Sequence, residues 1–169
     1  MCDRTALEAL PPGSLGHAYR AYCAREGLAP EGFVQVGEAG SLLEGLQDEL
    51  VRYAAERARD SHDLWHVVSG YRTDLIGEAG ILGFTVAQTH SPGLLMLFIG
   101  ALLHSFSLRW QHGVAMRRLA FVGLRSGFRA ESLAAVPWES WLARPLDEVR
   151  AELGITEAPH YTPHYHSRA

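Results

Sequence analysis

The chain has 169 residues, carries a formal net charge of −4 and is 47% hydrophobic, which suits a domain that buries its own core. This composition excludes a disordered tail protein. The mildly acidic balance is not that of a chain that wraps nucleic acid, so we expect no nucleic-acid partner. All 15 basic residues are arginines. Schiff-base chemistry and a Walker-type phosphate loop are therefore excluded, because both need a lysine.

Cysteine usage and the apolar runs predict where the chain resides. Two cysteines, Cys2 and Cys23, are too few for a disulfide framework and favour a reducing interior. The N-terminus opens no apolar signal segment. The most apolar run, from Gly93 to Leu103, is shorter than the roughly 20 residues that cross a bilayer. We interpret it as a buried core helix, with lining a tunnel for a lipid tail as a secondary role, and expect a cytoplasmic protein.

The N-terminal third carries two predicted helices. The first runs from Leu15 to Glu26, because Ser14 can cap its start and Gly27 stands where a C-cap is expected. The second ends near Arg59. Its apolar stripe recurs at steps of three and four residues, at Leu43, Leu46, Leu50 and Tyr53.

The middle of the chain predicts three further helices. Asp60 or Ser61 can cap a helix that continues to Ser69, and a glycine-punctuated helical stretch then reaches Gln88. His90-Ser91-Pro92 separates this stretch from a long apolar helix over residues 93–111.

The C-terminal third predicts one more long helix and two short ones. Residues 114–124 have a helical pattern, whose end we expect Gly123 and Gly127 to weaken. Pro137 and Pro145 begin the short helices. The best period-two segment, residues 32–36, is too short to found a sheet. We therefore predict an all-α fold, a single compact helical domain over residues 1–155. A polar tail rich in His and Tyr follows over residues 156–169, and we expect it to be disordered unless something holds it.

One stretch groups side chains that can bind a metal. His62 and His66 are four residues apart, so on a helix they lie about 40° apart in azimuth and about 6 Å apart along the axis. Asp63 lies about 60° from His66 on the same helix. Zinc proteases pair histidines at this spacing. Three metal-capable side chains therefore converge on one side of one predicted helix.

Glu78 completes this set only if the chain turns back. On one straight helix it would lie about 18 Å beyond His66. Gly70 and Gly77 stand where such a turn could form, which would place the site between the histidine-bearing helix and the next one. Two imidazoles and two carboxylates suit Zn²⁺, Fe²⁺ or Mn²⁺, and Mg²⁺ less naturally. Without thiolates, such a site is typical of catalysis rather than of structural zinc.

The same residues resemble the signature of a known family. Residues 62–88, HDLWHVVSGYRTDLIGEAGILGFTVAQ, are similar to the motif of the coenzyme Q (ubiquinone) biosynthesis protein 4 family. That motif is HD, two residues, H, eleven residues and E, and it is met by His62, Asp63, His66 and Glu78. Residues 10–19 resemble the family's N-terminal segment, with Ser14 in place of threonine. Residues 53–59 and 136–154 fit as well, so the resemblance covers nearly the whole chain.

The resemblance implies a specific function. Family members are mostly helical and bind a divalent metal, described as zinc, through the four motif residues, which we assign here as metal ligands and catalytic residues. They remove the carboxyl group at ring carbon 1 of a polyprenylated 4-hydroxybenzoate-type intermediate in ubiquinone biosynthesis and permit its hydroxylation. They associate peripherally with the membrane, here the inner face of the cell membrane, and with other enzymes of the pathway. Homo-oligomerisation stays open.

Two other functions are compatible with parts of this pattern. A non-catalytic scaffold that binds a prenyl lipid and organises the pathway's enzymes would need the same four residues. An HD-type phosphohydrolase also uses adjacent His and Asp, but it takes further ligands from distant helices and shows no Glu at this spacing.

Other residues near the motif have more than one possible role. Tyr71 or Asp74 could shuttle protons, although for Asp74 we rank a salt bridge to Arg72 first. Four arginines could meet an anionic head group or form a solvated helix face: Arg117, Arg118, Arg125 and Arg129.

Overall fold

The computed structural model describes residues 7–27, 61–158 and 160–164. Within these ranges the secondary structure is helical, and the only β feature is an isolated bridge between Ser14 and Pro145. The all-α prediction is confirmed. Two sequence-based predictions, the helix ending near Arg59 and the extended segment 32–36, lie outside the described residues. The chain divides into two units, one of residues 1–67 and 134–149 and the other of residues 68–133 and 150–169.

The first unit is organised around α2 (Leu15–Glu26), whose predicted limits are confirmed. The Ser14 side chain accepts a hydrogen bond from the His17 backbone N–H, and Gly27 ends the helix in the left-handed region at φ 68°. The start of α2 is pinned to the segment before α9. The N–H groups of Leu15 and Gly16 donate to the carbonyls of Arg144 and Leu142, at 2.8 Å each.

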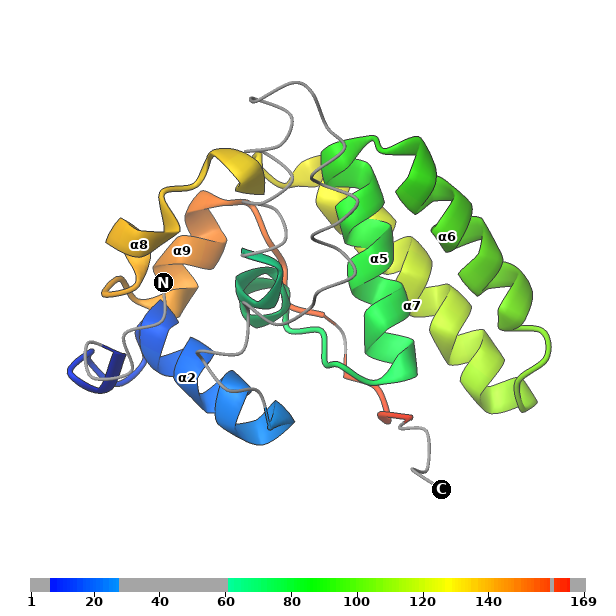
Figure 1. Cartoon of the computed structure of the whole chain (residues 1–169), viewed down its shortest axis with the longest axis horizontal. Coiled ribbons are helices and arrows are strands. Elements are labelled where there is room, and N and C mark those ends of the chain that lie inside the picture. Colours follow the sequence, from blue (N-terminus) through cyan, green and yellow to red (C-terminus); the bar gives the residue numbers. More distant parts are fainter. Residues whose placement is uncertain (1–6, 28–60, 159, 165–169) are drawn as a thin grey trace, which may run out of the picture. The chain divides into compact units, whose positions relative to one another are not determined.

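Short helices complete the C-terminal part of the chain. They are the 3₁₀ turn η2 (Leu133–Ala135) and two α-helices, α8 (Trp138–Trp141) and α9 (Leu146–Glu152). Figure 1 labels α8 and α9. Pro137 and Pro145 precede α8 and α9, as predicted. Trp138 and Val149 are fully buried, so these short helices are held by core contacts rather than by their own length.

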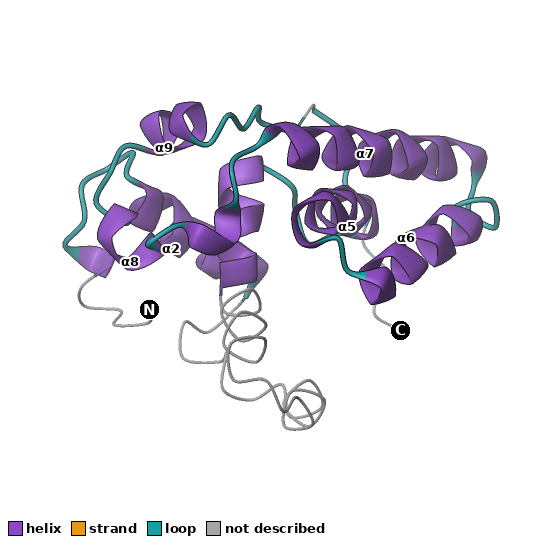
Figure 2. Ribbon diagram, turned by 90° about the horizontal axis from the view of Figure 1, so that it is seen from above, coloured by secondary structure: helices purple, strands orange, loops and turns teal. Residues whose placement is uncertain are grey.

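The second unit consists mainly of α5 (Leu75–Thr89), α6 (Pro92–His104) and α7 (Trp110–Arg129), seen side by side in Figures 1 and 2. Glycines let α5 and α7 approach with backbone in contact. A Cβ at Gly123 would overlap the carbonyl of Gly80, and a Cβ at Gly83 would overlap the carbonyl of Ala120. The prediction that Gly123 and Gly127 weaken the end of α7 is therefore wrong, because the helix continues to Arg129 and these glycines form its packing surface.

The apolar run that was interpreted as core forms α6, and that interpretation is wrong. The helix ends at His104 instead of continuing to residue 111, and Phe98 is its only buried residue. α5 packs mainly against α7, and α6 contacts both helices more sparsely. Most of its apolar side chains are therefore left at the surface.

Candidate metal centre

The two histidines lie on a short helix of residues 61–69. Its apolar residues are buried on nearly every side, including Leu64, Trp65 and Val68. His66 is also buried, at 1% exposure, whereas the His62 side chain is 41% exposed. Both imidazoles therefore project from one helix with a buried apolar surface, and the His62 imidazole is accessible from solvent.

The turn predicted at Gly70 is confirmed. Gly70 has φ 79°, in the left-handed region that glycine adopts without a steric penalty. The helical residues resume at Leu75, and Glu78 falls in the first turn of α5. Gly77, by contrast, lies inside α5 and makes no turn. A Cβ there would overlap the Arg72 carbonyl and the Tyr161 hydroxyl, so glycine is needed for close packing.

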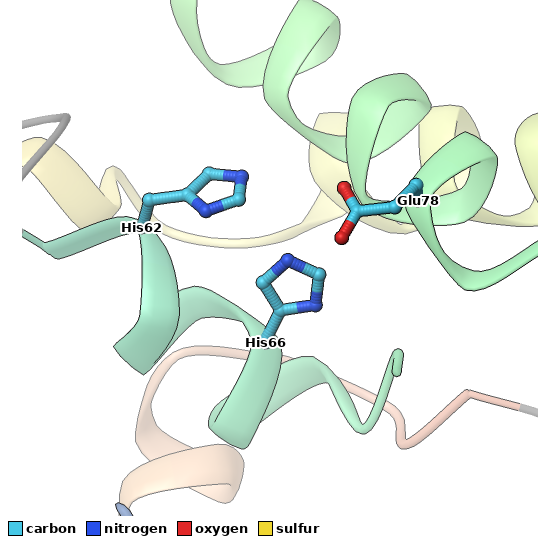
Figure 3. A group of neighbouring side chains, drawn as sticks. All are labelled: His62, His66 and Glu78. Carbon is cyan, nitrogen blue, oxygen red and sulfur yellow. The ribbon is translucent and has the colours of Figure 1, made fainter. Parts of the chain in front are cut away.

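Three of the four predicted ligands come together. His62, His66 and Glu78 each offer one ligand atom, and these atoms lie within 4.8 Å of one another. Figure 3 shows the Glu78 carboxylate directed towards both imidazoles. The rings of His62 and His66 meet edge to face at 4.7 Å between centroids. The His66 ring also stacks against the Tyr22 ring, with 5.7 Å between centroids.

The donor set fits a divalent metal. Two imidazole nitrogens and one carboxylate are the ligand types of catalytic zinc, which leave a coordination position for water or substrate. Ligand atoms that share one ion at bond lengths of about 2.0–2.2 Å lie at most about 4.4 Å apart. The observed limit of 4.8 Å is slightly wider, so the three ligand atoms would have to move somewhat closer together to bind one ion.

Asp63, the fourth predicted ligand, lies beside this group and not in it. One of its carboxylate oxygens is 3.8 Å from His62 Nδ1. The other, Oδ2, is buried and has no hydrogen-bond partner among the described residues. Burying a carboxylate oxygen unpaired costs about 1–3 kcal/mol or more, and a nearby cation would offset that cost. Its role as a ligand stays a prediction.

Asp74 has a structural role, although its partner differs from the predicted one. Its side chain caps α5 by accepting a hydrogen bond from the Ile76 N–H at 3.1 Å. The same carboxylate accepts from the Tyr161 hydroxyl at 2.8 Å and from the His164 N–H at 2.9 Å. The described part of the C-terminal tail is thus held against the start of α5, the helix that carries Glu78.

Tyr161 is the residue that sequence reasoning missed. Its hydroxyl accepts from the Arg72 N–H at 3.1 Å while it donates to Asp74. Burial, with the neighbouring Asp74 carboxylate, raises the pKa of Tyr161 well above its usual value, so the hydroxyl remains a donor. Burial also raises the pKa of Tyr71 to about 12, which argues against Tyr71 as a proton shuttle near neutral pH. The sequence feature that marks Tyr161 is the alternation of His and Tyr in the tail, but this alternation does not indicate which residues Tyr161 contacts.

Known proteins are similar to this chain in architecture and in sequence. A solved structure from Nostoc punctiforme, of a protein assigned provisionally to ubiquinone biosynthesis, superposes with a TM-score of 0.71 at 25% identity. The match covers 90% of this chain and 68% of that one. The mitochondrial ubiquinone biosynthesis protein COQ4 of Clavispora lusitaniae is 31% identical over 154 residues, covering 90% of this chain and 45% of its own. The corresponding Danio rerio homologue is 31% identical over 164 residues, 93% of this chain and 55% of its own.

Fold and site together define an all-helical protein with a nitrogen-and-oxygen group that could hold a metal. Residues 1–159 match the family described as coenzyme Q (ubiquinone) biosynthesis protein Coq4. The chain belongs to this family, which confirms the resemblance found in the sequence. It spans about half the length of the curated relatives named above.

Proposed function

We propose that this protein acts in ubiquinone biosynthesis and, there, removes the ring carbon 1 carboxyl group of a polyprenylated 4-hydroxybenzoate-type intermediate in a metal-dependent reaction. The observation that carries the proposal is the His62, His66 and Glu78 group in a chain of the Coq4 family. The names of the relatives point to the same pathway.

The chemistry proposed is a carbon–carbon bond cleavage. The bond between ring carbon 1 and the carboxyl carbon breaks, carbon dioxide leaves, and the electron pair stays on the ring carbon, which then takes one proton. A divalent metal at this site would supply Lewis acidity for binding and polarising the ring's oxygen substituents. The associated hydroxylation of ring carbon 1 needs a separate oxygen donor and is a distinct step.

The residues of this chain have separable roles in the proposal. His66 and Glu78 provide ligand atoms from helices that are anchored by burial and by the Asp74 cap. His62 provides the third from the accessible side. Asp63, beside His62 Nδ1, can orient that imidazole and help to balance the charge of the ion. We infer zinc as the resident ion, with Fe²⁺, Mn²⁺ or Mg²⁺ as substitutes.

The test is carbon dioxide release from a prenylated 4-hydroxybenzoate labelled at the carboxyl carbon. Wild-type protein loaded with zinc, iron or manganese should release label. Glu78→Gln, which keeps the size of the side chain and removes its charge, should lower release at least a hundredfold. The matched control, Glu157→Gln, changes a carboxylate that pairs with Arg150 outside the site and should leave release unchanged. No release from any metal-loaded wild-type sample contradicts decarboxylation.

The second candidate is a scaffold that binds prenyl lipid without reacting it. The exposed apolar side chains of α6 favour keeping this alternative, because they offer a surface for a lipid chain. A Glu78→Gln variant that loses carbon dioxide release but still binds the labelled lipid supports the enzyme. A wild-type protein that binds the lipid and never releases label supports the scaffold.

A further inference from the structure

The C-terminal tail contacts the second unit through a series of specific bonds. Residues 160–164, which we call the tail segment, pass the start of α5 and are drawn in red in Figure 1. Just before them, the Ala158 N–H donates to the Ser69 carbonyl at 2.8 Å, and Glu157 pairs with Arg150 at 3.3 Å. These contacts hold the chain that leads into the tail segment.

The tail segment satisfies backbone groups at the start of α5. The first N–H groups of a helix have no acceptor within that helix. At α5 the Leu75 N–H donates to the His164 carbonyl at 3.1 Å, and the His164 N–H donates in return to the Asp74 carboxylate at 2.9 Å. The same carboxylate caps the Ile76 N–H. The tail segment and the Asp74 cap therefore act together on one helix end.

The Tyr161 hydroxyl lies against the backbone that leads into Glu78. It donates to the Asp74 carboxylate at 2.8 Å and accepts from the Arg72 N–H at 3.1 Å. A Cβ on Gly77, the residue before Glu78, would overlap this hydroxyl. The Glu78 N–H donates to the Asp74 carbonyl at 2.8 Å. The backbone of Glu78 is therefore joined through Asp74 to a residue of the tail segment.

The other end of the tail segment rests on α7. The imidazoles of His112 and His164 stack with 4.0 Å between ring centroids and 31° between their planes. His112 lies in the first turn of α7. Because α5 and α7 pack with their backbones in contact, the tail segment joins the starts of two helices that also hold each other.

We propose that Tyr161 and Asp74 are positioning residues for Glu78, which raise the metal affinity of the candidate centre by fixing the first turn of α5. The inference rests on the metal centre of the proposed function, but not on decarboxylation. A metal site binds more tightly when its ligands are oriented by partners of their own, and loss of such a partner typically lowers the affinity about 10–100-fold. Here these partners act on the backbone that carries the ligand.

The test is the zinc affinity of the full chain, measured by competition with a chromophoric chelator. Tyr161→Phe removes one hydroxyl and should weaken zinc binding about tenfold. In a Glu78→Ala background the same change should weaken it less than about twofold, because the ligand that the hydroxyl positions is absent. Asp74→Ser keeps a helix-capping side chain but loses the second carboxylate oxygen, so it should weaken zinc binding as Tyr161→Phe does.

The matched control is Thr162→Val, which removes an exposed hydroxyl from the same tail segment and should bind zinc like wild type. Circular dichroism establishes that each variant is folded at the temperature of the titration. Where Tyr161→Phe is not folded, Asp74→Ser makes the same comparison with and without the Glu78 side chain.

Two outcomes would overturn this inference alone. One is a wild type that binds zinc and a folded Tyr161→Phe that binds it equally well. The other is an equal loss of affinity from Tyr161→Phe in the wild-type and Glu78→Ala backgrounds, which would assign Tyr161 a general role in stability. A wild type that binds no zinc contradicts the metal centre as well, and so separates failure of the proposed function from failure of the positioning role.

Discussion

Two residues, Asp74 and Tyr161, stabilise the start of α5, the helix that carries Glu78. Asp74 caps the helix, and Tyr161 joins the Asp74 carboxylate to the Arg72 backbone through one hydroxyl. Glu78 is then fixed by its position in the first helical turn. The start of α5 is therefore stabilised by a residue 87 positions further along the chain than Asp74, and no local sequence pattern predicts this contact.

We predict that Tyr161→Phe destabilises the protein by about 1–3 kcal/mol, because it leaves both a buried carboxylate oxygen and a backbone N–H without this partner. The measurement is the free energy of unfolding from urea titration. His160→Ala, which truncates an exposed neighbour in the same segment, is the control and should change stability by less than about 0.5 kcal/mol. Equal stability of Tyr161→Phe and wild type would show that the tail does not hold the start of α5.

The histidine pair was the part of the site that sequence could predict. Four-residue spacing on a helix determines which side of the helix both imidazoles occupy, and the described helix of residues 61–69 bears this out. The position of Glu78 depended on a turn, which Gly70 makes and Gly77 does not. Asp63 lies on the same helix as the two histidines, but its carboxylate is not part of the group, so a shared helix alone did not predict its position.

At the scale of elements, caps and glycines determine the helices. Ser14, Gly27 and the prolines before α8 and α9 gave correct boundaries because capping is a local interaction. The glycines of α5 and α7 could not be interpreted locally. These glycines allow α5 and α7 to approach closely. The helix propensity of glycine, considered for each helix alone, predicts only that glycine destabilises the helix.

We predict opposite effects for two Gly→Ala substitutions. Gly123→Ala places a Cβ against the Gly80 backbone, which cannot move aside as a side chain could, so unfolding free energy should fall by about 1–3 kcal/mol or more. Gly100→Ala lies inside α6 with no atom within 4 Å of the new Cβ and should raise it by up to about 1 kcal/mol. Circular dichroism melts and urea titration measure both. A neutral Gly123→Ala would contradict the close α5–α7 contact.

At the scale of the whole molecule, hydrophobicity predicted the class of fold but not which helix is buried. The apolar run of α6 has the composition of a core helix, yet α5 and α7 bury each other and leave α6 at the surface. Whether the apolar surface of a helix is buried depends on which other helices pack against it, and the sequence of that one helix does not predict this.

The proposed function requires that His62, His66 and Glu78 hold a divalent metal. Elemental mass spectrometry of the purified protein, after reconstitution with zinc, iron and manganese, tests it most directly. We predict close to one metal ion per chain for the wild type. His62→Ala/His66→Ala should lose it, because two of the three grouped ligands are removed. His17→Ala/His104→Ala, a control pair outside the group, should retain it. Absence of metal from the reconstituted wild type, or equal metal in wild type and the His62/His66 double variant, would contradict metal binding by this group.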